Sequence, residues 1–329
     1  MKEITITSND AGRRLDRFLR KYFHSASLGQ IYKIIRKNLK INGRRKDESY
    51  ILEDGDVLTL YVSDEDYEKL AGSSAGRTAG GHKAKRQFKI IYEDDNILIA
   101  DKPYGLLTHG DVHEKKNHLA NQVKDYLIEQ GDYDPRSEKV FAPAPANRID
   151  RNTTGLVLFG KTAAALRDLN MMIREDMVSK FYLTIVHGHI DRKLVLEDKL
   201  TKDSKLNKVA VGDEGLTIKT IVTPLQQLDC NTTLVEVQLV TGRSHQIRAH
   251  LASIGHPIIG DTKYATKQAV KLNRHMNDNF RLSTQLLHAY KLQFEETTDT
   301  LNYLEEKTFI APIPDAFGRI LESLGGHVE

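Results

Sequence analysis

The chain has 329 residues, of which 40% are hydrophobic and 28% charged, and its formal net charge at pH 7 is +3. Its length exceeds the roughly 100–200 residues of an ordinary domain, so we expect two folding units. No apolar run approaches the ~18 residues of a membrane-spanning helix, no secretory signal is visible, and the single cysteine, Cys230, excludes an intrachain disulfide. Composition therefore predicts a cytoplasmic globular protein and excludes membrane-spanning and disulfide-rich secreted classes.

The first unit is predicted at residues 1–62. Apolar residues at helical spacing predict two short helices at 15–22 and 28–37. Asn42-Gly43 is a turn dipeptide, and the flanking strand candidates are residues 39–41 and 57–62. Two helices and a small sheet result.

A basic segment lies inside this first unit, between residues 33 and 46, and contains no acidic residue. Taken alone, such a run is more often a solvated surface than a binding site. On a compact unit, however, it can follow a nucleic-acid backbone, which favours RNA binding. The basic residues are Lys33, Arg36, Lys37, Lys40, Arg44, Arg45 and Lys46.

Residues 63–87 are rich in Gly, Ser, Ala and charge and poor in large apolar side chains. That composition predicts a flexible linker, which would tether the first unit without fixing its orientation.

The second unit is predicted at residues 88–329, with strands and helices that alternate irregularly. We therefore expect an α+β protein, and no doubly wound sheet. The sequence has no GxxxxGK[ST], GxGxxG, CxxC or HExxH motif, so nucleotide, nicotinamide and structural-zinc sites gain no support. The predicted strands are 90–92, 97–100, 155–159, 181–186 and 234–240, and the predicted helices are 119–130, 162–175 and 244–254.

Asp150 stands between Arg148 and Arg151 in a polar segment, Asn147–Gly155, which runs into an apolar strand. Flanking cations favour the ionised carboxylate, which can act as a nucleophile or base without a cofactor. A surface turn residue paired with one of these arginines is an equally good interpretation of this spacing.

A second polar cluster spans residues 241–251. Arg243 precedes a predicted helix and is suited to bidentate pairing with a carboxylate or phosphate, whereas Arg248 is more simply interpreted as a solvated helix residue. His245 and His250 are five residues apart, so they would not share one metal ion.

Several ordered motifs resemble the RluA/RluC/RluD family of pseudouridine synthases. The family motif H-R-L-D-x-x-T-S-G is similar to N-R-I-D-R-N-T-T-G at Asn147–Gly155, and G-R-T-H-Q-I-R is similar to residues 242–248. Residues 1–62 resemble an S4 RNA-binding domain. Further matching pieces are Tyr92-Glu93-Asp94, Lys102-Pro103-Tyr104-Gly105, Lys180-Phe181-Tyr182, Gly255-His256-Pro257-Ile258, Gly260-Asp261 with Tyr264, and Leu287-His288-Ala289.

The resemblance implies an S4-like domain, a linker, and a catalytic domain with a mixed, mainly antiparallel central sheet flanked by helices. It implies isomerisation of uridine to pseudouridine in large-subunit ribosomal RNA, with Asp150 attacking a flipped-out nucleotide. Tyr182 would stack on the base and transfer protons, Arg243 would pair with the carboxylate, and Arg148 would fill the vacated space. No cofactor or metal is implied.

Two departures from the family pattern are Asn147 in place of His and Thr154 in place of Ser. Because Asn still donates and accepts hydrogen bonds, we infer a positional role for residue 147. The resemblance to the RluC branch is somewhat closer than to the RluD branch.

Three alternatives remain at this point. The chain could be a non-catalytic ribosome-assembly factor, although a carboxylate aimed into an anionic ligand's pocket argues against it. It could be a synthase acting on tRNA. It could also be a metal-dependent hydrolase using Asp191, Glu197, Asp198 and Asp203, which lack regular ligand spacing. The expected partner is ribosomal RNA or an assembly intermediate, and the expected state is a monomer.

Overall fold

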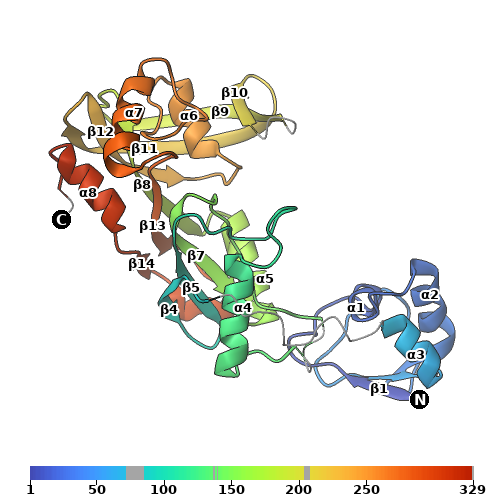
Figure 1. Ribbon diagram of the computed structural model, residues 1–329. Coiled ribbons are helices and arrows are strands. Elements are labelled where there is room, and N and C mark those ends of the chain that lie inside the picture. Colours follow the sequence, from blue (N-terminus) through green and yellow to red (C-terminus); the bar gives the residue numbers. More distant parts are fainter. Residues whose placement is uncertain (72–84, 136–137, 139, 204–207, 328–329) are drawn as a thin grey trace.

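The computed structural model describes residues 1–71, 85–135, 138, 140–203 and 208–327. The chain forms a small N-terminal unit, which stands to one side of a larger, elongated unit (Figure 1). Each unit has its own sheet and its own buried apolar side chains.

The N-terminal unit is a three-stranded antiparallel sheet covered by short helices, with strand order β1-β3-β2. Asn42 and Gly43 both have positive φ, at 49° and 77°, and the turn closes through hydrogen bonds between Ile41 and Arg44. The predicted Asn-Gly turn is thus confirmed. The elements are β1 (Lys2–Thr5), α1 (Leu15–Tyr22), α2 (Leu28–Lys33), a π-helical turn (Ile34–Asn38), β2 (Leu39–Ile41), β3 (Val57–Leu60) and α3 (Asp64–Ala71).

Helix α3 corrects the predicted linker. Residues 64–71 were expected to be unstructured, but Leu70 is buried in the N-terminal core and the Tyr67 hydroxyl lies 2.8 Å from that of Tyr22. Tyr67 and Leu70 give this charged segment one apolar face that can be buried. The overall composition of the segment does not reveal this face. The N-terminal unit therefore extends to Ala71. Residues 72–84 of the predicted linker lie outside the described residues, and at its end the backbone N–H of Gln87 donates to Gln122 on the larger unit at 2.9 Å.

The two units are in direct contact, contrary to the expected loose tether. Asn9 donates to the Glu138 carboxylate at 2.5 Å and accepts from the backbone N–H of Ala163 at 2.9 Å, at the start of a helix of the larger unit. Arg167 on the same helix donates to the carbonyl of Ala11. These contacts give the N-terminal unit a defined position.

The larger unit is built on an 11-stranded sheet whose main path runs β10-β9-β11-β12-β8-β13-β7-β5-β4, with β14 beside β13 and β6 beside β7. Only the β13–β7 pair is parallel among the described strands, so the predicted mixed, mainly antiparallel sheet is confirmed. The strands are β4 (Lys89–Glu93), β5 (Ile97–Lys102), β6 (Ala144–Pro145), β7 (Thr154–Gly160), β8 (Val178–His187), β9 (Leu194–Asp203), β10 (Lys208–Gly212), β11 (Leu216–Leu228), β12 (Thr232–Leu239), β13 (Leu287–Phe294) and β14 (Thr308–Ile310).

Helices cover both faces of this sheet. Alternate residues of β5 point to opposite faces, so Leu98 packs with α4 and Ile97 packs with α5. Helices α7 and α8 bury Met276 and Phe317 against the far end of the sheet. The helices are α4 (Leu119–Gln130), α5 (Ala163–Arg174), α6 (Gln246–Ser253), α7 (Ala269–Phe280), a 3-10 segment (Asp299–Leu304) and α8 (Asp315–Ser323).

Candidate active site

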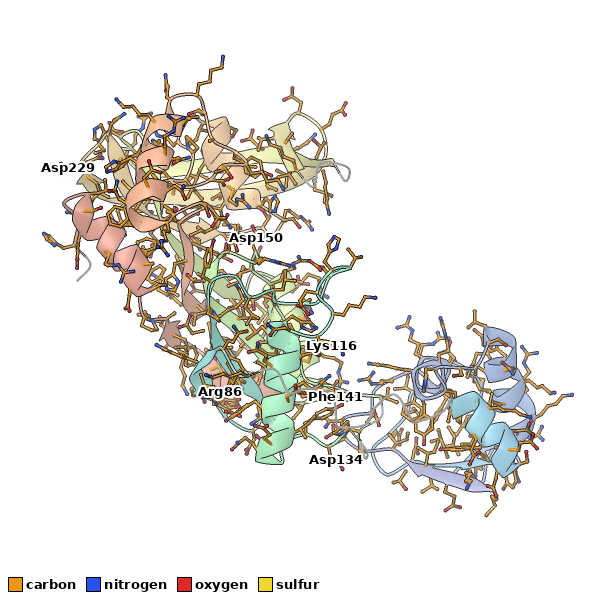
Figure 2. All side chains as sticks on the ribbon, in the orientation of Figure 1. Arg86, Lys116, Asp134, Phe141, Asp150 and Asp229 are labelled. Carbon is orange, nitrogen blue, oxygen red and sulfur yellow. The ribbon has the colours of Figure 1, made fainter. Side chains whose placement is uncertain are left out.

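Asp150 lies in the loop between β6 and β7, near the middle of the larger unit (Figure 2). The loop is fixed on both sides of the carboxylate. Before it, Ile149 exchanges two hydrogen bonds with the hydroxyl of Thr108, at 3.0 and 3.3 Å. After it, the Arg151 carbonyl accepts from the ammonium of Lys102 at 2.9 Å. A side chain that is 27% exposed is therefore presented on an anchored backbone.

The ammonium of Lys102 is fully buried and also donates to the carbonyls of Pro103 and Leu106. Burial lowers the pKa of Lys102 to about 7, while the charge of Asp150 opposes that shift. Three carbonyl acceptors suit an ammonium better than a neutral amine, so Lys102 also brings positive charge close to Asp150.

Gly155 allows β7 to approach β13 closely just after this loop. Its φ is +107°, and a Cβ there would lie 2.1 Å from the carbonyl oxygen of Ala289. Beside it, the Thr154 hydroxyl lies 2.8 Å from Nδ1 of His288, which is fully buried. Asn147 accepts from the N–H of Leu158 at 2.8 Å. These contacts fix the start of the strand that follows Asp150.

The cation paired with Asp150 is Arg248 on α6. Its Nη1 lies 3.4 Å from Oδ2 of Asp150, and its Nε and Nη2 donate to the two carboxylate oxygens of Asp261 at 2.7 and 2.9 Å. Burial would lower the pKa of Arg248, but Asp261 and Asp150 raise it above its ordinary value. The interpretation of Arg248 as a solvated side chain is wrong, because only 9% of the side chain is exposed.

Arg243 is placed differently from its predicted role. It lines the same pocket as Asp150, but among the described residues its guanidinium makes no ion pair with that carboxylate. The reason is the turn before α6, in which His245 has left-handed backbone geometry at φ 54°. Arg243 is thereby an exposed lining residue before α6, and Arg248, five residues later and inside α6, reaches the carboxylate.

Tyr182 on β8 forms another wall of this pocket, together with Asp150 and Arg148. It is nearly fully buried, at 5% exposed. Burial, and then the charge of Asp150, raises the pKa of Tyr182 far above its ordinary value, so the phenol stays protonated at neutral pH. The pocket thus combines a carboxylate, a phenol that can donate a proton, and an aromatic ring.

The pocket opens into a wider cavity with further cationic side chains. Arg148, Arg174 and Arg243 line it, and so does the buried Lys180, whose ammonium donates to the carbonyl of Val178. Such a lining attracts a polyanion and guides it toward Asp150.

Besides Arg248, Asp261 and Lys102, two further residues near Asp150 were not predicted as site residues. His245 places Nε2 3.9 Å from Oδ2 of Asp150, and Tyr264 lies 3.0 Å from Nδ1 of the same imidazole. The Gly260-Asp261 and Tyr264 motif was visible in the sequence, but its spacing did not reveal which residues it would contact.

Of the acidic residues considered for a metal site, Glu197 and Asp198 have separate partners, and the side chain of Asp203 lies outside the described part of the structure. Glu197 and Asp198 are neighbours on β9 and point to opposite faces. Glu197 pairs with Lys219, and Asp198 contacts the buried His250 at 2.9 Å. Within the described ranges, no group of three or more His, Cys, Asp or Glu side chains could hold a metal ion.

The predicted basic residues of the N-terminal unit lie on its surface. Arg36 and Lys40 stack over the rings of Tyr32 and Tyr61, at 6.0 and 5.6 Å from the ring centroids. In the part of the chain that the structure describes, none of these basic residues is in an ion pair. Five are exposed and Lys40 is half-buried; the set is Lys33, Arg36, Lys37, Lys40, Arg44 and Arg45.

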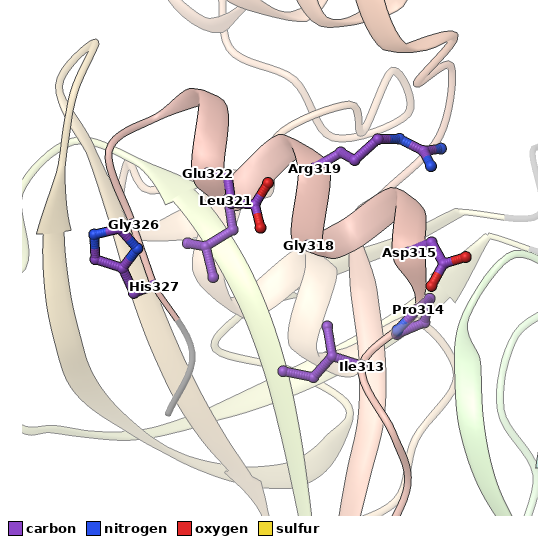
Figure 3. A pocket seen from close by; sticks show the side chains of 9 residues that line it. All are labelled: Ile313, Pro314, Asp315, Gly318, Arg319, Leu321, Glu322, Gly326 and His327. Atoms are coloured by element: carbon purple, nitrogen blue, oxygen red, sulfur yellow. The ribbon is translucent and has the colours of Figure 1, made fainter.

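A separate pocket lies beside α8 and the C-terminal segment (Figure 3). Its lining mixes Asp315, Arg319, Glu322 and His327 with a few apolar side chains, and it contains none of the predicted site residues.

No described helix is long and apolar enough to cross a membrane.

Comparison with known proteins relates this arrangement to one family. A family model described as RNA pseudouridylate synthase matches residues 96–253. Ribosomal large subunit pseudouridine synthase C of Vibrio cholerae is 32% identical, over 88% of this chain and 88% of its own length. A protein of Mycoplasma capricolum described as an uncharacterized RNA pseudouridine synthase is 30% identical, over 94% and 97%. The solved structure of human RNA Pseudouridylate Synthase Domain Containing 4 has the same fold, with 21% identity and a TM-score of 0.54 over 72% of this chain and 92% of that chain.

Proposed function

Because the chain belongs to the RluA-type RNA pseudouridylate synthase family, we propose that it converts uridines of large-subunit ribosomal RNA to pseudouridine with Asp150 as nucleophile. The observation that carries this proposal is a single pocket in which Asp150 faces Arg248 and Tyr182. The ribosomal substrate is supported by the names of similar proteins, including the enzyme of Vibrio cholerae.

The chemistry needs only groups of this chain and the RNA. A carboxylate oxygen of Asp150 bonds to the target nucleotide, at the ribose anomeric carbon or on the uracil ring, and the bond between N1 and the anomeric carbon breaks. The uracil turns in the pocket, C5 bonds to the anomeric carbon, and the carboxylate is released. The proton lost from C5 balances the one gained at N1, so the reaction is an isomerisation with no net reactant besides uridine.

The neighbours of Asp150 suit these steps. The arginine at position 248 holds negative charge at the carboxylate in a partly dry pocket, where such interactions are stronger than in water. Tyr182 can stack on the uracil. Because its raised pKa keeps the phenol protonated beforehand, it can also supply a proton. Once Asp150 is esterified, the charge that raised the pKa of Tyr182 is gone, and the phenol becomes a better acid for the later proton transfer.

A uridine within structured RNA must leave its stack to reach this pocket, at a cost of a few kcal/mol. We assign Arg148, at the pocket mouth, to the space that the flipped base vacates. The N-terminal unit is assigned to RNA binding as an S4-like domain, with its exposed cations on phosphates. The partner is naked ribosomal RNA or an assembly intermediate, and one chain carries all the groups named here.

The test is to incubate the full chain with unmodified large-subunit rRNA and, separately, with tRNA transcripts. Both reactions contain a chelator and no added nucleotide. Carbodiimide-dependent primer-extension stops then report pseudouridine. Stops in rRNA alone support the proposal. Stops in tRNA alone would show that the substrate is tRNA and not rRNA. No stops in either RNA, despite binding, would overturn the proposed reaction.

A further inference from the structure

The two donors nearest Asp150 converge on one of its oxygens. Nη1 of Arg248 and Nε2 of His245 lie 3.4 and 3.9 Å from Oδ2. Among the described residues, no group donates a hydrogen bond to Oδ1. The carboxylate is therefore asymmetric, with both nitrogens on the side of Oδ2.

A chain of hydrogen bonds favours one tautomer of His245. The backbone N–H of Val209 donates to the hydroxyl oxygen of Tyr264 at 3.0 Å. An amide can only donate, so this contact uses an acceptor site of the phenol and leaves its O–H free to donate to Nδ1 of His245, 3.0 Å away. When the phenol donates, Nδ1 is the acceptor and the ring hydrogen sits on Nε2.

Electrostatics favour the same tautomer. With the hydrogen on Nε2, a positive N–H dipole faces the Oδ2 anion, whereas a lone pair at that position would face it with repulsion. The imidazole has little freedom to turn, because 14% of the His245 side chain is exposed and its ring packs edge-on against Tyr264 at 5.8 Å.

The backbone of His245 is also unusual. Its φ of 54° lies in the left-handed region, which is uncommon outside Gly and in which Asn, Asp and His are the most frequent other residues; its side chain does not cap α6. Strained residues that persist in a structure concentrate at functional sites. Here the left-handed turn directs the imidazole at Asp150, and the helix that follows directs Arg248 at the same oxygen.

We propose that His245 is a positioning residue whose Nε2–H, fixed by Tyr264, holds Oδ2 of Asp150 together with Arg248, so that Oδ1 is the attacking oxygen. This inference rests on the proposed function, in which Asp150 is the nucleophile. It also gives roles to the segment 260–264, since Asp261 orients Arg248 and Tyr264 orients His245.

Two amide substitutions separate this role from a purely structural one. In His245→Gln, the side-chain amide can reach the position of Nε2 and donate to Asp150. In His245→Asn, the shorter amide matches Nδ1 and leaves Oδ2 without that donor. Asn, however, tolerates left-handed geometry better than Gln. A backbone role therefore predicts that Asn is the better replacement, and the proposal predicts that Gln is.

The readout is the single-turnover rate of pseudouridine formation with enzyme in excess, beside RNA affinity. We expect His245→Asn and His245→Ala to lower the rate about tenfold, because each removes the Nε2–H that faces the charged Oδ2 at 3.9 Å and can close to hydrogen-bond distance when the nucleotide binds. His245→Gln should retain most of the rate, and RNA affinity should change less than threefold throughout. A faster Asn variant, or equal rates for all three, would overturn the proposal.

A measurement without RNA keeps the inference separate from the proposed substrate. Ring ¹⁵N spectra of the free protein, with the His245 signals identified by their loss in His245→Gln, should show a protonated Nε2 and an unprotonated Nδ1. Tyr264→Phe removes the hydroxyl and should shift this tautomer balance. A proton on Nδ1 in the unmodified protein would contradict the inference, even if the RNA assay succeeded.

Discussion

The guanidinium of Arg248 and the carboxylate of Asp150 lie 3.4 Å apart, although 98 residues separate them in the chain. Arg248 cannot easily move from this position, because two of its nitrogens are bound to the carboxylate of Asp261, whose side chain is 1% exposed. The pair therefore links the loop before β7 to the start of α6.

Replacing Arg248 by Lys should lower the single-turnover rate about 100-fold, because removal of one preorganised donor at a reacting charge typically costs 10²–10³. A lysine cannot serve both Asp261 and Asp150. RNA affinity should change little. The matched control is Arg243→Lys, in the lining of the same pocket, which should weaken RNA binding more than it lowers the rate. A larger loss of single-turnover rate in Arg243→Lys than in Arg248→Lys would indicate that Arg243 is the partner of Asp150.

Gly155→Ala should destabilise the protein by more than about 2 kcal/mol, because a left-handed φ and a close backbone contact act together. The added Cβ would lie 2.1 Å from the oxygen of Ala289, and φ is +107°. Gly318→Ala is the control: Gly318 lies inside α8 with open space around it, so alanine should stabilise that helix by about 0.5–1 kcal/mol. Urea unfolding measures both. Equal stability of the two variants would show that β7 and β13 can separate at low cost.

The buried His288 should make stability depend on pH. Burial lowers the pKa of His288 to about 4, against 6.5 in an unfolded chain. Between these values the unfolded state binds a proton that the folded state does not, so stability falls as pH is lowered from 6.5 to 4. The contribution is on the order of 3 kcal/mol at full development. His288→Asn, which can still bond to Thr154, should flatten this dependence in urea unfolding between pH 7 and pH 4.5. An unchanged slope would mean that other groups govern acid unfolding.

The basic residues of the N-terminal unit should govern the salt dependence of RNA binding. Replacing Lys33, Arg36, Lys37 and Arg44 with Ala should weaken rRNA affinity and reduce the slope of log affinity against log salt by roughly 0.7–0.9 for each lost phosphate contact. Filter binding over a range of salt concentrations measures the slope. A lower affinity with an unchanged slope would show that these side chains do not contact phosphates.

The sequence predicted the regular elements best where one local signal dominated. Helix α4 matches its predicted limits, and the Asn42-Gly43 turn forms because both residues accept positive φ. Strand β9 was missed, because the mostly charged residues of its second half are also typical of a polar loop. Helix α3 was missed because its two large apolar side chains stand among mostly charged residues, and the composition of the segment therefore predicted a linker. In both cases burial depends on contacts with distant segments.

The site was predicted in part for the same reason. Asp150 and Tyr182 could be assigned from motifs, and the structure brings both into one pocket. The resemblance assigned Arg243 to the carboxylate, whereas the structure places Arg248 there, and motif spacing does not show how the left-handed turn at His245 directs the following helix. The function of Asp261 could not be seen either, since its partner Arg248 is reached only when α6 packs against the loop.

The most direct test of the account compares the Asp150→Asn variant with the unmodified chain on the same rRNA, by single-turnover pseudouridine formation and by equilibrium binding. Asn retains the shape of the side chain and removes the nucleophilic charge. The account predicts that isomerisation is abolished while RNA affinity stays within about tenfold, or ~1.4 kcal/mol. An Asp150→Asn variant that forms pseudouridine at the normal rate would contradict it.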